Sequence, residues 1–417
     1  MEKSGKFRLT SLERNWILYD VGNSAFVLMV ATLIPIFFNA LAAAGGLSSV
    51  EYLAYWGYAS SAVTIITAVL SPILGTVADT KGFKKPIFIL CVFVGIVGCC
   101  AMGAVSAWLP FLVIFVIAKV GFSGSLVFYD SMLSDVTTPE RMDEVSSRGY
   151  AWGYIGSCVP FVVCLGLVLG AGSIGISQMT ALNLALLLTA AWWLLTTLPL
   201  LKSYKQLYYV EVEKHAVRQS FARIGHTLRH LPEDKQVFWF LLAFFCYIDG
   251  VYTIIDMATA YGTALGLDTT GLLLALLVTQ IVAFPSALIF GRLSNKYPSA
   301  KLIPVCIAAY AGIAVFAFFL TRQWQFWVLA VIVGMFQGGV QALSRSHFAK
   351  IIPPEKSGEY FGLFDICGKG ASFLGTMIVS VGSQLTGSAN VGVGSLIVLF
   401  IVGFVLFRVS CRQGETV

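Results

Sequence analysis

Long apolar stretches recur along almost the whole chain, and they constrain its fold more than any other feature. A helix needs about 20 predominantly apolar residues to cross the roughly 30 Å hydrocarbon core of a membrane. Only 12% of the residues are charged and the mean hydropathy is +0.83, unlike an ordinary soluble domain. About twelve stretches reach the required length, near residues 14–43, 52–78, 86–107, 110–136, 145–171, 177–200, 236–263, 269–293, 301–320, 323–350, 358–384 and 390–410. We therefore expect a polytopic membrane protein.

The apolar stretches predict helices rather than strands. Runs such as residues 87–105 are continuous, whereas the strands of a membrane barrel alternate apolar and polar residues over about ten positions. The basic N-terminus precedes a segment that is too long and too polar for the core of a cleaved signal peptide, so we expect a retained first helix. The predicted fold class is all-α, with twelve transmembrane helices.

Basic residues concentrate on one side of the predicted membrane. Numbering the segments from a cytoplasmic N-terminus leaves only Arg322 in the opposite loops, so the positive-inside rule predicts that both termini are cytoplasmic. This topology also accounts for the net charge of +6, and no aromatic-rich basic groove indicates nucleic acid. The residues on the basic side are Lys3, Lys6, Arg8, Arg14, Lys81, Lys84, Lys85, Arg141, Arg148, the run from Lys202 to Lys235, Arg292, Lys296, Lys301, Lys350, Lys356, Arg408 and Arg412.

One long polar stretch divides the predicted spans six and six. It predicts an N-terminal half at 1–200, a cytoplasmic linker at 201–234 and a C-terminal half at 235–417. His226 and His230 stand four residues apart, but without a carboxylate or cysteine beside them they are more typical of a solvated helix face than of a metal site. We expect no metal and no cofactor. Apolar residues at helical spacing predict an amphipathic helix within the linker: Val217, Phe221, Ile224, Leu228 and Leu231.

The two halves carry a weak internal repeat. GTVADTKGFKK at 75–85 closes the second segment and GRLSNKYPSAK at 291–301 closes the eighth, while TPERMDE at 138–144 corresponds to PPEKSGE at 353–359. In this register Gly124 pairs with Gly339 and Asp130 with Arg345. Repeated halves with a site between them are how many secondary transporters are built, so the repeat predicts two pseudo-symmetric six-helix halves.

The loop after the second segment resembles a signature of the major facilitator superfamily. That signature has a glycine, an aspartate four residues later, then a glycine followed by basic residues, and here Phe83 stands where a basic residue is usual. The residues that fill it are Gly75, Asp79, Gly82, Lys84 and Lys85. The resemblance implies the fold of this superfamily and a gating role for Asp79 and Lys84.

A second, more specific resemblance extends over nearly the full chain. WILYDVGNSAF, SPILGTVAD, YIDGVYTIIDMATAYG, QIVAFPSALIFGRLSN and GGVQALSRSHFAKIIPPEKSGEYFGLFDICGK together look like the vacuole-effluxer family of that superfamily, named for a fungal exporter of vacuolar amino acids. The resemblance implies alternating-access transport of amino acids or similar small solutes. The substrates of bacterial members are mostly unassigned. The compact length and short loops resemble bacterial members, which implies the bacterial inner membrane.

Ionisable residues inside the apolar segments are the candidates for chemistry. Each costs at least about 2.5 to 3.5 kcal/mol at the centre of a membrane helix, so it needs a partner or an aqueous cavity. Asp20 and Asn23 share one face of the first segment, and Asp249 and Asp256 share one face of the seventh. Burial disfavours a charged carboxylate, so these groups could bind and release protons. For Asp20, packing at an inner gate is an equal alternative, and for the seventh segment the alternative is a fixed ion pair.

Further candidates lie in the fourth, tenth and eleventh segments. Lys119, Gln337 and Gln341 are candidate solute or coupling residues, although Lys119 could simply pair with a carboxylate. Arg345 suits a carboxylate of the solute or of the protein, and an ion pair with Asp20 or Asp365 at the inner gate is the favoured reading. The remaining candidate gating residues are Asp130 and the acid–base pair Asp365 and Lys369, which could also be purely structural.

These patterns favour a secondary transporter, with a proton gradient as the expected energy source, small solutes and membrane lipids as partners, and a monomeric state. An uncoupled facilitator and a lipid translocator or receptor on the same scaffold remain alternatives. No enzyme is expected: GFSGS at 121–125 lacks the last glycine of a nucleophile elbow, and Asp249 and Asp256 share one helix, so they cannot face each other as a protease dyad.

Overall fold

The computed structural model describes residues 7–211, 225–227 and 229–414, with the backbone alone at 49–50, 53, 259–260, 263–264, 269–270, 273 and 369–373. Among the described residues, regular structure is helical, and the one extended pairing is an isolated bridge between Thr80 and Val210. The predicted all-α class is confirmed.

Each predicted apolar segment corresponds to a helix or to two consecutive helices. The first six segments form α1 (Ser11–Ala31), α2 (Leu33–Ala44), α3 (Ser49–Ala78), α4 (Lys84–Met102), α5 (Trp108–Ser131), α6 (Leu133–Val136), α7 (Met142–Leu169) and α8 (Gln178–Ser203). The short helix η1 (Leu231–Glu233) precedes the second six, which form α10 (Lys235–Ala264), α11 (Thr269–Leu293), α12 (Ser299–Phe318), α13 (Gln323–Ile351), η2 (Pro354–Lys356), α14 (Ser357–Thr386), α15 (Ala389–Gly394) and α16 (Ile397–Gly414).

In the part of the chain that the structure describes, twelve helical segments are long enough to cross a membrane. Within the described residues, eleven are also apolar enough by composition, the first of them the continuous pair Ser11–Ala44. The twelfth is α14, whose 30 residues span about 45 Å at 1.5 Å per residue. It packs against α3 and α10, so it belongs to the bundle. The number of predicted spans is confirmed.

The first span is broken at Thr32, which separates α1 from α2. Thr32 has φ −132° and ψ −75°, outside the helical range. Pro35 accounts for the break, because proline has no N–H to donate to the carbonyl of Ala31 and its ring clashes with that carbonyl. A capping box between Thr10 and Glu13 fixes the other end of α1. This anchored end carries the polar residues of the first segment.

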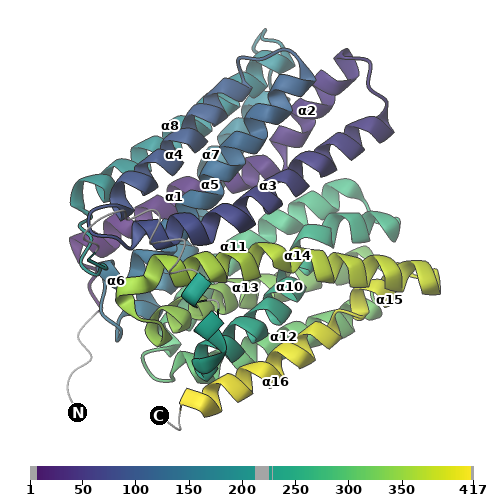
Figure 1. Cartoon of the computed structure of the whole chain (residues 1–417). Coiled ribbons are helices and arrows are strands. Elements are labelled where there is room, and N and C mark those ends of the chain that lie inside the picture. Colours follow the sequence, from purple (N-terminus) through teal and green to yellow (C-terminus); the bar gives the residue numbers. More distant parts are fainter. Residues whose placement is uncertain (1–6, 212–224, 228, 415–417) are drawn as a thin grey trace.

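The helices form two bundles that lie side by side (Figure 1). Helices α1–α8, coloured purple to teal, make up one half, and helices α10–α16, coloured teal-green to yellow, make up the other. The start of α1 and the end of α16 lie at the same end of the bundle, which we call the terminal end. The halves meet chiefly through α3 with α14, and α7 with α11 and α13. In the repeat, α3 corresponds to α11 and α7 to α14, so the two main contacts are related by the pseudo-symmetry.

The connection between the halves is described only in part. Val217, Phe221, Ile224 and Leu228, on which the predicted amphipathic helix rests, lie outside the described residues, and Leu231 begins η1.

Candidate functional site

Arg345 extends from α13 into a pocket of the N-terminal half. Its Nη1 donates to Oδ1 of Asp130 at 2.9 Å, its Nε donates to Oγ of Ser146 at 2.9 Å, and its Nη2 donates to the carbonyl oxygen of Ser146 at 3.0 Å. Its side chain is 2% exposed. A guanidinium presents its donors in a rigid plane, so this single side chain fastens α13 to both α5 and α7.

Three aromatic rings surround the same guanidinium. The distances from its central carbon to the ring centroids are 4.7 Å for Trp16, 5.4 Å for Tyr129 and 4.3 Å for Tyr150. Trp16 stacks on Tyr129 and donates from Nε1 to the Tyr129 carbonyl at 3.0 Å, which fixes both rings. A desolvated cation over an aromatic face gains about 2 kcal/mol. The N-terminal half therefore provides an aromatic socket for Arg345.

Asp20 and Asn23 of α1 lie beside this socket. Asp20 Oδ2 is 3.9 Å from Arg345 Nη1 and, within the described part of the chain, has no hydrogen-bond partner. Asn23 Nδ2 donates to the Tyr19 carbonyl at 3.0 Å and is 3.5 Å from Asp20 Oδ1. Of the two partners expected for Arg345, Asp20 is thus close but secondary to Asp130. The other, Asp365, accepts a hydrogen bond from Ser71 Oγ of α3 at 2.7 Å.

Gly149 of α7 leaves the room that the guanidinium needs. A Cβ atom at this position would lie 3.1 Å from Arg345 Nη2, from Asp20 Oδ2 and from the Trp16 ring. Such contacts are tighter than ordinary van der Waals packing on three sides. The small residue is therefore a steric requirement of the socket.

Asp79 joins the end of α3 to the start of α14. Its Oδ1 accepts from the Gly358 N–H at 2.7 Å and its Oδ2 accepts from the Glu359 N–H at 2.8 Å. These are unpaired donors of the first turn of a helix, where the helix dipole favours an anion. Burial raises the pKa of Asp79 to about 7, while the Lys84 ammonium and the two N–H groups act in the opposite direction. The negative charge of Asp79 thus depends on these partners.

Lys84 completes this contact. Its Nζ lies 3.7 Å from Asp79 Oδ1 and 3.5 Å from Asp135 Oδ2, and it donates to Ser357 Oγ at 2.8 Å. The side chains of all three charged residues are buried, with Lys84 and Asp79 at 0% exposure. Asp79 and Lys84 thus bind the first turn of α14 to the N-terminal half, and Asp135 lies beside Lys84.

The start of α7 makes the corresponding contacts with the C-terminal half. Ser346 Oγ donates to Asp143 Oδ1 at 2.6 Å, and Lys350 Nζ lies 2.6 Å from Asp143 Oδ2. Asn295, which occupies the repeat position of Asp79, donates to Glu144 Oε2 at 2.7 Å. Asp79 accepts hydrogen bonds across the interface, whereas Asn295, at the equivalent position of the other half, donates one.

Close helix approach accompanies the polar contacts. A Cβ atom on Gly75 would collide with the carbonyl oxygen of Gly358, and one on Gly358 would lie 2.5 Å from the carbonyl oxygen of Gly75. One turn further along, a Cβ on Gly362 would lie 2.7 Å from the Ser71 carbonyl. The backbones of α3 and α14 are in direct contact, which side chains of any size would prevent.

The carboxylates predicted in the seventh segment lie in α10, away from the Arg345 socket. Asp249 is 0% exposed, and its Oδ1 accepts from the Gly375 N–H of α14 at 2.9 Å and from Thr253 Oγ1 at 3.3 Å. Asp256 is exposed. Lys119 of α5 is half-buried, with Nζ 4.7 Å from the Phe122 ring centroid. The side chain of Lys369 lies outside the described residues.

Gln337 lines a cavity inside the C-terminal half. The cavity has a volume of about 60 Å³, and its lining includes Thr253, Tyr261, Phe326 and Val333. The lining residues that the structure describes all belong to the C-terminal half, and none of them is charged. The carbonyl oxygen of the Gln337 side chain is buried and has no hydrogen-bond partner among the described residues. The cavity therefore suits an apolar group that carries a hydrogen-bond donor.

Gln341 lies one turn further along α13, where the halves meet. Its Oε1 accepts from the Tyr154 hydroxyl of α7 at 2.8 Å. Gln337, Gln341 and Arg345 thus follow one face of α13 from the cavity to the aromatic socket, as their spacing predicts.

Sequence reasoning missed several residues of these contacts. Asp135, Asp143 and Glu144 were not singled out, although they are acids in or beside apolar segments, the signal that identified Asp130. Tyr150 and Ser146 carry no such signal, because neutral residues at a helix interface look like ordinary packing.

Comparison with known proteins identifies the family. The family model described as "Vacuole effluxer Atg22 like" matches residues 11–416. The chain belongs to the vacuole effluxer Atg22-like family. A member from Bacillus subtilis, an "Uncharacterized MFS-type transporter YxiO", is 42% identical over 98% of this chain and 97% of its own length. The expected resemblance is thereby confirmed, and the chain is a transporter of the major facilitator superfamily and an integral membrane protein.

Fungal members of the Atg22-like family are more distant. "Autophagy-related protein 22" of Coccidioides immitis is 25% identical over 65% of this chain and 51% of its own length, so the chain spans about half of that relative. Among solved structures, the human organic anion transporter MFSD10 superposes with a TM-score of 0.72 at 13% identity, covering 95% of this chain and 98% of that one. FucP in the outward conformation gives 0.71 at 16% identity, covering 96% and 97%. These two likenesses confirm the major facilitator fold.

Proposed function

We propose that this protein moves amino acids or similar small solutes across the bacterial inner membrane by alternating access, driven by protons. In this proposal the two halves, 1–200 and 235–417, rock against each other about their interface, and the linker 201–234 connects them. The terminal end faces the cytoplasm and is closed in the conformation described here.

The contact between Arg345 and its socket is the observation that carries this proposal. It joins the halves near the terminal end, as do Asp79 with Gly358 and Asp143 with Lys350. All are hydrogen bonds and ion pairs, which can break and re-form without a covalent change. Contacts of this kind suit an interface that opens and closes, as a rocking transporter requires.

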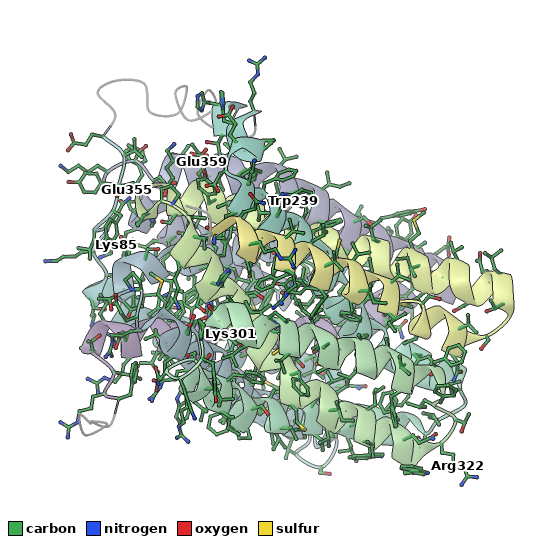
Figure 2. All side chains as sticks on the ribbon, turned by 90° about the horizontal axis from the view of Figure 1, so that it is seen from below. Lys85, Trp239, Lys301, Arg322, Glu355 and Glu359 are labelled. Carbon is green, nitrogen blue, oxygen red and sulfur yellow. The ribbon has the colours of Figure 1, made fainter. Side chains whose placement is uncertain are left out.

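The distribution of charge supports the orientation. Lys85 and Glu355 lie at the terminal end, whereas Arg322 lies at the opposite end of the molecule (Figure 2). Lysine and arginine are enriched in cytoplasmic loops, so the basic terminal end is assigned to the cytoplasm.

The cavity beside Gln337 is the proposed solute site of the C-terminal half. Its apolar lining favours an uncharged side chain, and the unpaired Gln337 oxygen is a ready acceptor for an N–H group. Gln341, one turn away, bonds to the N-terminal half, so occupancy of the cavity and closure of the terminal end involve one helix face. A neutral amino acid with an apolar side chain has the required groups.

Asp249 and Asp256 are the proposed proton sites, and Asp20 is a third candidate beside the gate. Asp249 is buried with one oxygen unpaired among the described residues, and Asp256 is exposed on the same helix. A carboxyl group that gains and loses contact with water as the halves move can bind and release a proton.

Transport by purified protein in liposomes tests the proposal. Counterflow of radiolabelled leucine, glycine and lysine is measured first, and then net uptake with an imposed proton gradient. We expect leucine counterflow, and leucine accumulation with the gradient. Counterflow without gradient-driven accumulation would indicate an uncoupled facilitator, and absence of counterflow with lipid scrambling would indicate a lipid translocator. Either result would overturn the corresponding part of the proposal.

A further inference from the structure

The residues that leave α8 run along the loop between α3 and α4. We call residues 204–211 the strap. Val210 N donates to the Asp79 carbonyl at 2.8 Å, and the Gln206 side chain accepts from the Gly82 N–H at 3.0 Å. Gln206 Nε2 also donates to the Ala78 carbonyl at 3.1 Å. The first part of the connection between the halves is thus attached to the loop that carries Asp79 and Lys84.

Asp135 is the point to which the strap is most firmly bound. Its Oδ1 accepts from the backbone N–H groups of Leu207 and Tyr208 at 3.0 and 2.9 Å, and its Oδ2 accepts from the Tyr204 hydroxyl at 2.6 Å. Tyr204 and Asp135 are buried, at 2% and 3% exposure. Three of the donors to this buried carboxylate therefore come from the strap.

Asp135 connects the strap to the interface between the halves. Lys84 lies 3.5 Å from Asp135 Oδ2 and donates to Ser357 at the start of α14. A buried charge that loses its hydrogen bonds is strongly destabilised. If the strap detached, Asp135 would need new donors, and Lys84 is the nearest cation that could turn towards it and away from Ser357.

We propose that the strap is a positioning element for the contact of Asp79 and Lys84 with the start of α14. By supplying three donors to Asp135 it allows Lys84, 3.5 Å from this carboxylate, to donate to Ser357 and to lie beside Asp79, and so it favours closure of the terminal end. This inference rests on the proposed alternating access, and Tyr204 and Asp135 are its positioning residues.

Hydrogen exchange at the start of α14 measures this effect without transport. The Gly358 and Glu359 amides are bonded to Asp79, so their exchange reports opening of the contact. Full-length Y204F loses only the hydroxyl that donates to Asp135, and Q206A loses the two side-chain hydrogen bonds that join the strap to Ala78 and Gly82. We expect each variant to speed exchange of a peptide covering residues 357–361 at least threefold in detergent micelles.

A matched control lies on the same strap. Lys81 and Glu211 form an ion pair at 3.6 Å with side chains 62% and 77% exposed, so E211Q should leave the exchange unchanged. In a K84Q background, Y204F should add nothing further, because the strap acts through Lys84. A purely structural role for Tyr204 predicts additive effects in the double variant instead.

The result separates this inference from the proposed function. Unchanged exchange at 357–361 in both Y204F and Q206A, in protein that melts at the wild-type temperature, would overturn the positioning role even if transport is observed. Faster exchange in both variants, together with no transport of any solute by the wild type, would support the positioning role while removing the proposed substrate class.

Discussion

Arg345 of α13 donates to Asp130 of α5 at 2.9 Å, and the two residues occupy equivalent positions in the internal repeat. They are 215 residues apart, the same offset that separates TPERMDE at 138–144 from PPEKSGE at 353–359. Residues at equivalent positions of pseudo-symmetric halves can meet only where they lie near the axis that relates the halves. An acid in one copy and a base in the other turn that meeting point into a bond between the halves.

Replacing Arg345 tests the strength of this bond. Lysine keeps the charge but lacks the planar fork that donates from three nitrogens to Asp130 and Ser146 and stacks on the surrounding rings. Removing one partner of a buried ion pair costs about 3–5 kcal/mol, so we expect R345Q to open the terminal end more than R345K. Hydrogen exchange of peptides that cover residues 142–150 and 341–350 measures this opening of the terminal end.

The acids beside Arg345 provide a matched pair. D130N weakens a 2.9 Å charged bond, whereas D20N changes a group 3.9 Å away, so we expect D130N to accelerate exchange more. Equal effects of D130N and D20N would show that the guanidinium interacts with both carboxylates alike.

The contact between Gly75 and Gly358 predicts a second effect on closure. In G75A the new methyl group collides with the Gly358 carbonyl, so α14 must move away from α3. Overpacking of this kind costs about 1–3 kcal/mol, here against the closed arrangement alone. We expect faster exchange at 357–361 and a transporter that favours opening at the terminal end.

The same helix supplies the control for this substitution. A Cβ on Gly57 would meet no atom within 4 Å, so G57A should only gain the higher helix propensity of alanine, about 1 kcal/mol at most. Similar exchange in G75A and G57A would contradict the close approach.

Asp249 offers a way to separate proton binding from folding. Asparagine keeps an oxygen that can accept from Gly375 and Thr253, but its amide does not bind a proton at the pH of a transport assay. We expect D249N to retain solute counterflow and to lose accumulation driven by a proton gradient, while D249A also loses thermal stability. D256N is measured in parallel. Gradient-driven accumulation in both asparagine variants would show that neither residue couples transport.

Much of the fold can be predicted from the sequence, because in a bilayer every span must satisfy its own backbone hydrogen bonds. Segments of about 20 apolar residues predict the twelve helices, and a helix cannot be exchanged for another element in lipid. Thr32 shows the limit: its break requires recognising that Pro35, four residues after Ala31, removes a hydrogen bond inside an otherwise continuous apolar run. The superfamily signature also indicates Asp79 and Lys84, because its loop is contiguous in sequence.

Which residues bond to each other across the interface between the halves cannot be predicted in the same way. Arg345 is identifiable as a buried cation, but whether it bonds to Asp130, Asp20 or Asp365 depends on the rotation and tilt of three helices. Asp135 illustrates a second reason. Its donors are backbone N–H groups of Leu207 and Tyr208, and any residue type can supply those, so no pattern in the sequence marks them.

The cavity beside Gln337 predicts the last effect, on solute binding. Val333 lines it at 6% exposure, so V333F fills part of its volume, and Q337L removes the buried oxygen that awaits a donor. A hydrogen bond contributes about 0.5–1.5 kcal/mol, so Q337L should weaken leucine binding up to about tenfold. The rise in Tm with leucine concentration measures Kd. Val328 lies on the same helix but is 38% exposed, so V328F should bind leucine like the wild type. Wild-type affinity in both V333F and Q337L would exclude this cavity as the solute site, whereas a loss confined to these two variants would locate the apolar part of the solute beside α13.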